Sequence, residues 1–256
     1  MKTEDYEYLY QLEERFWWFA GMREIAAALL DPHLPAGSRE ILDAGCGTGG
    51  NLEWLSRYAG DGAITGVDLI ETALQFCRER GARRLAQASA TDLPFADESF
   101  DLVTSFDVLV QIPGEGADEQ AIREMFRALR PGGIAFVRCA AYEWMKSGHD
   151  LALGTQRRYR SEELRKKMER AGFEVLRETY ANSLLFPIAA IRRLALKRLG
   201  LADGGSDVKP LPPHLEWLNR LLRRALLWEG RFLRRAGARL PAGLSVICLA
   251  RRPLAG

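Results

Sequence analysis

The sequence predicts an α/β protein with an open, mostly parallel seven-stranded sheet and helices on both faces. Three observations lead to this expectation. Residues 41–50, ILDAGCGTGG, have the pattern of a short buried strand that breaks into glycines where a helix should begin. A second strand, at residues 63–67, ends in Asp68, nineteen residues after Gly49. Further strand patterns then alternate with helix patterns, which is typical of βαβ units.

Length and composition limit the class of protein. The chain has 256 residues, of which 47% are hydrophobic, so it can bury one sizeable core. No apolar run reaches the roughly 18–20 residues that span a bilayer, and the acidic, aromatic N-terminus is unlike a secretory signal. Four scattered cysteines and three histidines show no metal-ligand spacing. We therefore expect a cytoplasmic protein with reduced thiols and no metal site.

Residues 1–38 are predicted to form an N-terminal helical and aromatic segment. The run Phe16-Trp17-Trp18-Phe19 precedes a helical pattern that continues to Leu30. Four consecutive aromatic residues cannot all lie on one helical face. The segment could be a hydrophobic clamp, or a lid that excludes water from a ligand. Trp18 and Arg23 are candidate substrate-binding residues.

The remaining elements follow in regular order. After the glycine loop, helices are expected at residues 51–58, 71–80, 119–129 and 161–171. Strands are expected at residues 84–88, 101–106, 134–138, 173–179 and 245–250.

The glycine loop is the candidate ligand site. Gly45, Gly47 and Gly49 allow a tight turn and a close approach of backbone to a ligand. Asp43, at the base of the loop, suits a cationic, amine-bearing ligand better than the diphosphate of a dinucleotide. Asp68 lies where nucleotide-binding βαβ units place the acid that binds a ribose.

This pattern resembles D-x-G-x-G-x-G, the first motif of the class I S-adenosylmethionine-dependent methyltransferases, whose fold is Rossmann-like. Residues 88–109, ASATDLPFADESFDLVTSFDVL, and the Arg-Pro-Gly-Gly turn at 130–133 are similar to the type 11 domain group of that family. The Trp-Trp-Phe run and the Arg-Arg-Tyr run at 157–159 match one bacterial subfamily. The resemblance therefore covers nearly the whole chain. It implies that the last strand is a reversed edge strand.

The resemblance implies S-adenosyl-L-methionine as cofactor. The cofactor-binding residues that it implies are Asp43, Gly45, Cys46, Gly47, Gly49, Asn51, Asp68, Leu69, Ser89, Ala90, Thr91 and Phe106. Ser89 stands where relatives usually have an acid that contacts adenine, so backbone at Ala90 and Thr91 is expected to share that contact. The candidate catalytic bases are His149, Tyr159 and Asp107, and the further candidate substrate-binding residues are Gln111, Arg157 and Arg158. Relatives often have histidine at the position of Gln156.

The expected reaction is methyl transfer by in-line displacement to a small-molecule, lipid-linked or sugar-linked acceptor. Two alternatives remain open, a nicotinamide-dependent oxidoreductase and a non-catalytic cofactor-binding subunit. No nucleic-acid partner is expected, because the Asn-Pro-Pro-aromatic signature of amino-methylating nucleic-acid enzymes is absent.

Residues 180–243 are predicted to be a helical insertion between the last two strands of the core, which spans 39–179 and continues at 244–256. Its helices are expected at 184–199 and 215–235. Although the net charge of the chain is only +2, residues 192–239 hold 12 Lys/Arg against 4 Asp/Glu. The predicted apolar face of the second helix consists of Leu215, Leu218, Leu221, Leu222, Ala225, Trp228 and Phe232. Glu229 falls on this face and needs an arginine or backbone partner.

The insertion has two interpretations. It could pack on the sheet edge and serve only the fold. It could instead be a basic cap that recruits an anionic or lipid-linked acceptor, with peripheral contact to a membrane surface.

Overall fold

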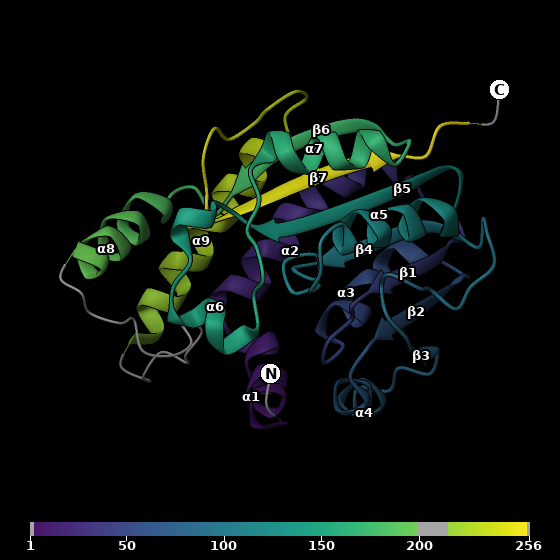
Figure 1. Ribbon diagram of the computed structural model, residues 1–256, viewed down its shortest axis with the longest axis horizontal. Coiled ribbons are helices and arrows are strands. Elements are labelled where there is room, and N and C mark those ends of the chain that lie inside the picture. Colours follow the sequence, from purple (N-terminus) through teal and green to yellow (C-terminus); the bar gives the residue numbers. More distant parts are fainter. Residues whose placement is uncertain (1–2, 199–214, 255–256) are drawn as a thin grey trace.

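The computed structural model describes residues 3–198 and 215–254, and Figure 1 shows one twisted sheet at its centre. The sheet has seven strands in the order β3-β2-β1-β4-β5-β7-β6. The strands are β1 (Glu40–Ala44), β2 (Ala63–Asp68), β3 (Leu85–Gln87), β4 (Phe100–Phe106), β5 (Leu129–Ala140), β6 (Glu174–Ala181) and β7 (Ser245–Arg251). All pairs are parallel except those of β7 with β5 and β6. The predicted fold class is confirmed.

Two details of the sheet differ from the prediction. The last strand, β7, is antiparallel as expected, but it lies between β5 and β6, so the edge on that side is β6. Strand β5 begins at Leu129 and includes the predicted turn at 130–133, because the backbone of Arg252 bonds both Gly132 and Gly133. A register shift between Phe100 and Leu102 of β4 accommodates the extra residues.

Helices cover both faces of the sheet (Figure 1). They are α1 (Thr3–Arg15), α2 (Trp17–Leu30), α3 (Gly50–Ala59), α4 (Glu71–Glu79), α5 (Ala117–Ala128), α6 (Gly148–Leu153), α7 (Ser161–Arg170), α8 (Phe186–Arg198) and α9 (Glu216–Leu233), with short 3-10 turns at Asp31–His33 and Glu143–Met145. One core cluster joins α2, α3 and α9 to the sheet, and a second joins α5 and α7 to it. The loop predicted between the two insertion helices lies largely outside the described residues, and the bounds of the predicted domains stay a prediction.

Helix α9 packs closely along α2. A Cβ at Gly21 of α2 would lie 2.4 Å from Cδ1 of Leu226, and one at Gly230 would lie 3.3 Å from the carbonyl oxygen of Glu24. The buried residues of α9 are Leu226, Glu229, Gly230 and Leu233. The predicted apolar face of this helix was therefore partly wrong, since Leu221 and Trp228 are exposed. The helix turns its glycine toward α2 because only a small residue permits this approach.

Glu229 has the backbone partner that its burial requires. Its Oε1 accepts a hydrogen bond of 2.8 Å from the N–H of Leu184, just before α8. Burial nevertheless raises the pKa of this carboxyl above its ordinary value. The contact ties α9 to the segment between β6 and α8.

Gly21→Ala should destabilise the protein, because the new methyl group would overlap both Cδ1 and Cβ of Leu226. We expect a loss of about 1–2 kcal/mol in the free energy of unfolding, after the gain in helix propensity is subtracted. Urea denaturation measures it. Leu226→Gly removes both of these atoms, so the double variant should lose less than the sum of the two single variants. Additive losses would mean that α2 and α9 do not meet here.

Candidate functional site

The glycine loop after β1 is fixed by two backbone hydrogen bonds. The N–H groups of Gly45 and Cys46 donate to the carbonyl of Val67 at 2.7 and 2.8 Å. Gly45 has a φ of 91°, and a Cβ there would lie 2.1 Å from Cγ2 of Val108. Gly47 has a φ of 54°, and a Cβ there would meet no atom within 4 Å. The loop therefore needs glycine for its backbone, and the space in front of Gly47 is open.

Asp68, at the end of β2, faces this loop. Its Oδ2 accepts a hydrogen bond of 2.8 Å from the N–H of Gly47, and its Oδ1 accepts one of 3.0 Å from the N–H of Ile70. Burial raises the pKa of the Asp68 carboxyl above its ordinary value. The carboxylate thus holds the first and second strand-to-helix loops together and retains acceptor capacity, since each oxygen has two lone pairs.

Asp43 is fully buried at the base of the loop. Its Oδ1 accepts a 2.7 Å hydrogen bond from the hydroxyl of Thr104 on β4, whereas its Oδ2 is buried without a partner among the described residues. Burial is the main reason why the pKa of this carboxyl rises to about 7. A buried acceptor without a donor is costly, and a cationic donor would satisfy it.

The N-terminal helix α1 is fastened to the start of α3. Glu13 accepts hydrogen bonds from the Thr48 hydroxyl at 2.7 Å and from the Gly50 N–H at 3.0 Å. Arg80, just after α4, lies 3.4 Å from the same carboxylate oxygen, and its guanidinium lies 4.2 Å from the ring centre of Tyr10. Glu13 could not be recognised from the sequence, because its partners lie more than thirty residues away.

Arg23 of α2 also reaches the start of α3. Its Nε donates to Oδ1 of Asn51 at 3.2 Å. Its Nη2 is buried without a hydrogen-bond partner among the described residues, and it lies 2.8 Å from the position that a Cβ on Gly50 would occupy. Arg23 thus has a cationic donor without a hydrogen bond close to the glycine loop, and the carboxylate of Glu13 interacts with it electrostatically. Asn51, a predicted cofactor-binding residue, helps to position it.

A cluster of aromatic and charged residues lies at the carboxyl ends of β4 and β5. Arg138 donates two hydrogen bonds, of 2.9 and 2.6 Å, to Oδ2 of Asp107. Its guanidinium lies 4.7 Å from the ring centre of Trp18 and 5.1 Å from that of Phe106. The structure therefore brings together a predicted substrate-binding residue, Trp18, a predicted cofactor-binding residue, Phe106, and a candidate base, Asp107. Arg138 was missed, although a charged residue at the end of a buried strand was a signal for it.

Ser89 and Thr91 form a small hydroxyl pair after β3. Their oxygens are 2.7 Å apart, and the Thr91 N–H donates to the Ser89 hydroxyl at 3.2 Å. Ala90 between them is half-buried, and Leu69, after β2, is 61% exposed. The assignment of these residues to the adenine end of the cofactor stays a prediction.

Other predicted site residues have structural partners. Tyr159 is fully buried, and its hydroxyl donates to Oδ2 of Asp118 at 2.7 Å. Arg157 forms an ion pair of 2.9 Å with the other oxygen of Asp118, and the buried Arg158 bonds Asp150 twice, at 2.7 and 3.0 Å. This placement favours structural over substrate-binding or catalytic roles for all three.

Three further predicted residues are quickly placed. Gln111 is exposed in the turn after β4. Gly49, with a φ of 84°, directly precedes α3. The side chain of His149 lies outside the described part of the structure.

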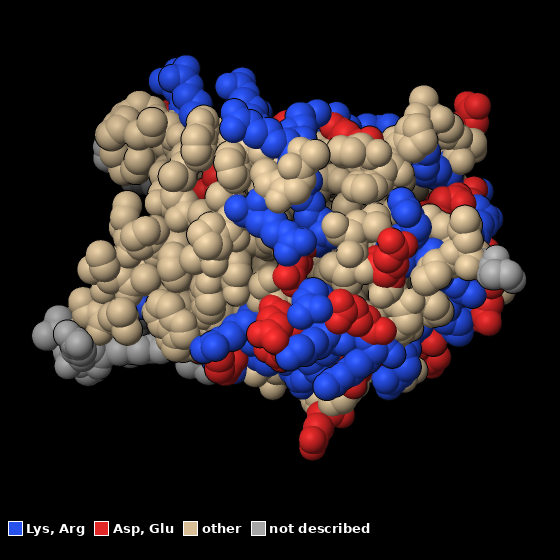
Figure 2. Space-filling view, turned by 90° about the horizontal axis from the view of Figure 1, so that it is seen from above, with Lys and Arg blue, Asp and Glu red and all other residues tan. Residues whose placement is uncertain are grey.

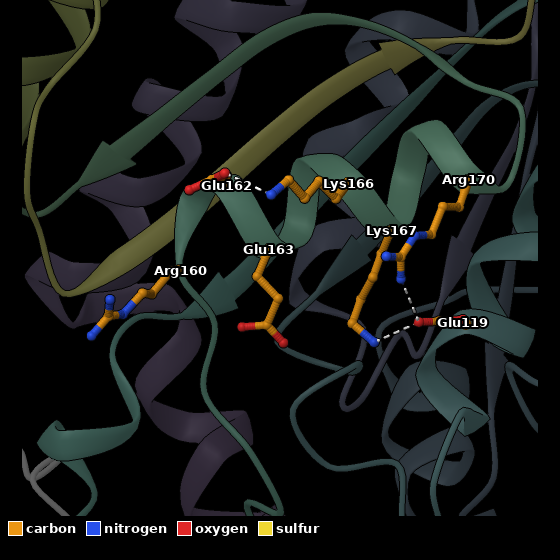
Figure 3. Close-up of a pocket in the computed structure, with 7 residues that line it drawn as sticks. All are labelled: Glu119, Arg160, Glu162, Glu163, Lys166, Lys167 and Arg170. Carbon is orange, nitrogen blue, oxygen red and sulfur yellow. Dashed lines mark hydrogen bonds and ion pairs between the residues drawn. The ribbon is translucent and has the colours of Figure 1, made fainter.

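A surface hollow of about 330 Å³ lies at α5 and α7 (Figure 3). It is lined by Glu119, Arg160, Glu162, Glu163, Lys166, Lys167 and Arg170. Lys166 pairs with Glu162 at 2.7 Å, and Lys167 and Arg170 both pair with Glu119. We assign no ligand to this hollow, because its charges largely neutralise one another. Within the described residues, no cluster of three or more His, Cys, Asp or Glu could hold a metal ion.

Known proteins are similar to this chain in sequence and in fold. Residues 42–137, from β1 to β5, match the model of a family described as a methyltransferase domain. A probable S-adenosylmethionine-dependent methyltransferase of Mycolicibacterium smegmatis is 31% identical over 167 residues, which cover 64% of this chain and 62% of that protein. The chain contains a class I methyltransferase domain. The predicted resemblance to S-adenosylmethionine-dependent methyltransferases is confirmed, and the cofactor of this family is S-adenosyl-L-methionine. The match to one bacterial subfamily stays a prediction.

Two further proteins are similar to this chain. A fatty-acid O-methyltransferase of the same organism is 35% identical over 98 residues, 37% of this chain and 35% of that protein. The methyltransferase domain thus lies in a chain that spans less than two thirds of these relatives. The crystal structure of the cyclase SpnF matches 90% of this chain and 82% of that one, with a TM-score of 0.55 and 26% identity.

The raised pKa of Asp43 gives the methyltransferase domain a pH dependence. Burial raises the pKa of this carboxyl from 3.8 to about 7, so the folded chain keeps the proton over a range in which the unfolded chain loses it. Its contribution to the stability of the unliganded fold is therefore complete below about 3.8 and is lost as the pH rises from there to about 7. The affinity for a cationic ammonium group changes with pH in the opposite direction, because the ionised carboxylate is the form that binds a cation. Affinity for S-adenosylhomocysteine should rise by up to about tenfold per pH unit below 7 and level off above it.

Calorimetry between pH 5.5 and 8.5 measures this dependence. Asp43→Asn keeps an oxygen acceptor for Thr104 but cannot ionise, so its binding should be weaker at pH 8 and nearly independent of pH. A wild-type affinity that does not change with pH would contradict the assignment of Asp43.

Proposed function

We propose that this protein transfers the methyl group of S-adenosyl-L-methionine to a hydrophobic, lipid-like acceptor. The observation that carries the proposal is a pair of buried, unpartnered polar atoms of opposite charge near the glycine loop, Oδ2 of Asp43 and Nη2 of Arg23. The amino-acid end of the cofactor has both an ammonium and a carboxylate group. It would supply the missing partner for each atom.

The other residues of the loop fit the same cofactor. Asp68 would accept hydrogen bonds from the ribose hydroxyls, and the open space at Gly47 would admit the ligand close to the backbone. Glu13 would keep α1 over the start of α3, where it limits access of water. Arg23 was predicted to bind the substrate, and its position beside Gly50 leads us to assign it to the cofactor instead.

Catalysis would depend mainly on position. When bound, the cofactor supplies a methyl group that its sulfonium already activates, so the protein must align and desolvate the acceptor. Trp18 and Phe106 flank the Arg138 guanidinium and provide an apolar wall. Asp107 is the best-placed base for an acceptor hydroxyl, because Arg138 bonds its Oδ2 and no described residue bonds its Oδ1.

The acceptor class rests on two kinds of support. A relative named as a fatty-acid O-methyltransferase shares 35% identity with part of this chain. In addition, aromatic rings gather at the carboxyl ends of β5 and β6, where the ring centre of Tyr142 lies 5.2 Å from that of Tyr180 and 5.3 Å from that of Phe186. Such rings suit an acyl chain or an aromatic lipid better than a small polar molecule.

The test is methyl transfer from methyl-labelled S-adenosyl-L-methionine to long-chain fatty acids, fatty alcohols and phenolic lipids, with short-chain analogues as matched controls. We expect labelled lipid and S-adenosylhomocysteine in equal amounts, and much less product from the short chains. Cofactor binding without turnover on any acceptor would favour a non-catalytic subunit. Binding of a nicotinamide dinucleotide in place of S-adenosylhomocysteine would favour an oxidoreductase.

A further inference from the structure

Helix α8 and the residues before it expose an apolar stripe. The side chains of Leu184, Ile188, Ile191 and Leu194 are 48%, 67%, 69% and 50% exposed. Their spacing of four, three and three residues places them on one side of the helix. The opposite side points inward, where Arg193 is buried and donates to the carbonyl of Met145. The stripe therefore belongs to a helix with a fixed orientation.

Helix α9 exposes a second stripe with a different composition. Trp217, Leu221 and Trp228 are 57%, 54% and 56% exposed, and at about 100° per residue they lie within one narrow arc. Exposed arginines occupy the adjacent arc of the same helix, at positions 220, 224 and 231. Within the described residues these arginines have no ion pair. Tryptophan and arginine side by side on an exposed helix suit the boundary between water and lipid.

Helix α8 lies at the carboxyl ends of the parallel strands, which is the same end of the sheet as the glycine loop. Strands β5 and β6 run in the same direction, because both are antiparallel to β7. Helix α8 starts just after the carboxyl end of β6, and its Phe186 packs on Tyr142, which follows β5. Figure 2 shows a broad area with few charged side chains at the end of the molecule that α8 and α9 form, with basic side chains beside it.

We propose that α8 and α9 dock the protein on the surface of an anionic lipid bilayer. The aliphatic and tryptophan side chains would enter the boundary between headgroups and acyl chains, and the arginines would contact lipid phosphates. No helix among residues 3–198 and 215–254 is long and apolar enough to cross a membrane, so the contact would be peripheral. The lipid acceptor of the proposed function gives this docking a purpose, but vesicle binding itself does not depend on methyl transfer.

Sedimentation with phospholipid vesicles tests the proposal. The full chain should sediment with vesicles of phosphatidylcholine and phosphatidylglycerol, and at least tenfold less with phosphatidylcholine alone. Ile188→Asp with Ile191→Asp should weaken binding to the anionic vesicles at least tenfold, since each change removes an aliphatic side chain from the lipid and adds a negative charge. Leu254→Asp, at a leucine that is 75% exposed at the other end of the chain, is the matched control and should bind like the wild type.

The arginines have their own matched pair of variants. Reversal of Arg220, Arg223 and Arg224 to glutamate should weaken binding at least tenfold, because each basic residue near an anionic surface contributes about a fivefold factor. Reversal of three exposed arginines elsewhere, Arg83, Arg123 and Arg170, changes the net charge equally and should weaken binding far less. Binding of S-adenosylhomocysteine should be unchanged in every variant, which shows that each is folded.

Two results would overturn the proposal. One is wild-type protein that stays in solution with both kinds of vesicle while it still binds S-adenosylhomocysteine. The other is a dimer in light scattering that Ile188→Asp with Ile191→Asp converts to a monomer without any change in vesicle binding, because the apolar face would then serve a second copy of the chain. Failure of S-adenosylhomocysteine to bind would count against the proposed function and not against docking.

Discussion

Asp68→Ala should weaken the binding of S-adenosylhomocysteine by about ten- to a hundredfold. The carboxylate is the predicted acceptor for the ribose hydroxyls, and a hydrogen bond to a charged group contributes about 1.5–3 kcal/mol. The same side chain also holds the N–H groups of Gly47 and Ile70, so its loss removes support for the loop as well. Isothermal titration calorimetry on the folded variant measures the change.

Asp68→Asn is the conservative control. It keeps the size of the side chain and one acceptor oxygen, so its affinity should fall between those of the wild type and the alanine variant. 5′-Methylthioadenosine keeps the ribose but lacks the amino-acid end of the cofactor, and Asp68→Ala should weaken its binding as well. Unchanged affinity for both ligands in folded Asp68→Ala would remove Asp68 from the site.

Arg23→Met should also weaken the binding of S-adenosylhomocysteine by about ten- to a hundredfold, for a different reason. The guanidinium leaves a buried Nη2 unpartnered, and we assign it to the carboxylate of the ligand. Methionine fills similar space but donates no hydrogen bond. Because 5′-methylthioadenosine has no carboxylate, its affinity should be nearly the same for Arg23→Met and the wild type.

Comparison of the two ligands thus separates a direct contact from a general loss of structure. Arg23→Lys should recover part of the affinity, since it restores the charge without the planar fork. If Arg23→Met lowers the affinity for both ligands equally, Arg23 only stabilises the contact between α2 and the start of α3.

Local sequence patterns were sufficient for the parts of the site that are continuous in the chain. The glycine loop and Asp68 each follow a short buried strand, and both the strand and the residue that ends it are visible in the sequence. The predicted bounds of β2 and β4 lie within one residue of the observed ones for the same reason. The structure and the family match confirm the fold that these patterns predict.

Contacts between distant segments could not be predicted in this way. Glu13 bonds Gly50 across 37 positions, and Arg138 bonds Asp107 across 31, so neither pair forms a local motif. The place of β7 inside the sheet depends on pairing along its whole length with both β5 and β6. The buried face of α9 depends on its contact with Gly21 of α2, and the hydrophobic periodicity of α9 alone does not predict that contact.

Titration of the wild-type protein with S-adenosylhomocysteine by calorimetry at pH 8 tests whether the glycine loop binds the cofactor. Because we assign Asp43, Arg23 and Asp68 to one site at this loop, we predict saturable binding of one ligand per chain. 5′-Methylthioadenosine should compete for that site, and a nicotinamide dinucleotide should not. Absence of saturable binding, or displacement of the ligand by a nicotinamide dinucleotide, would contradict it.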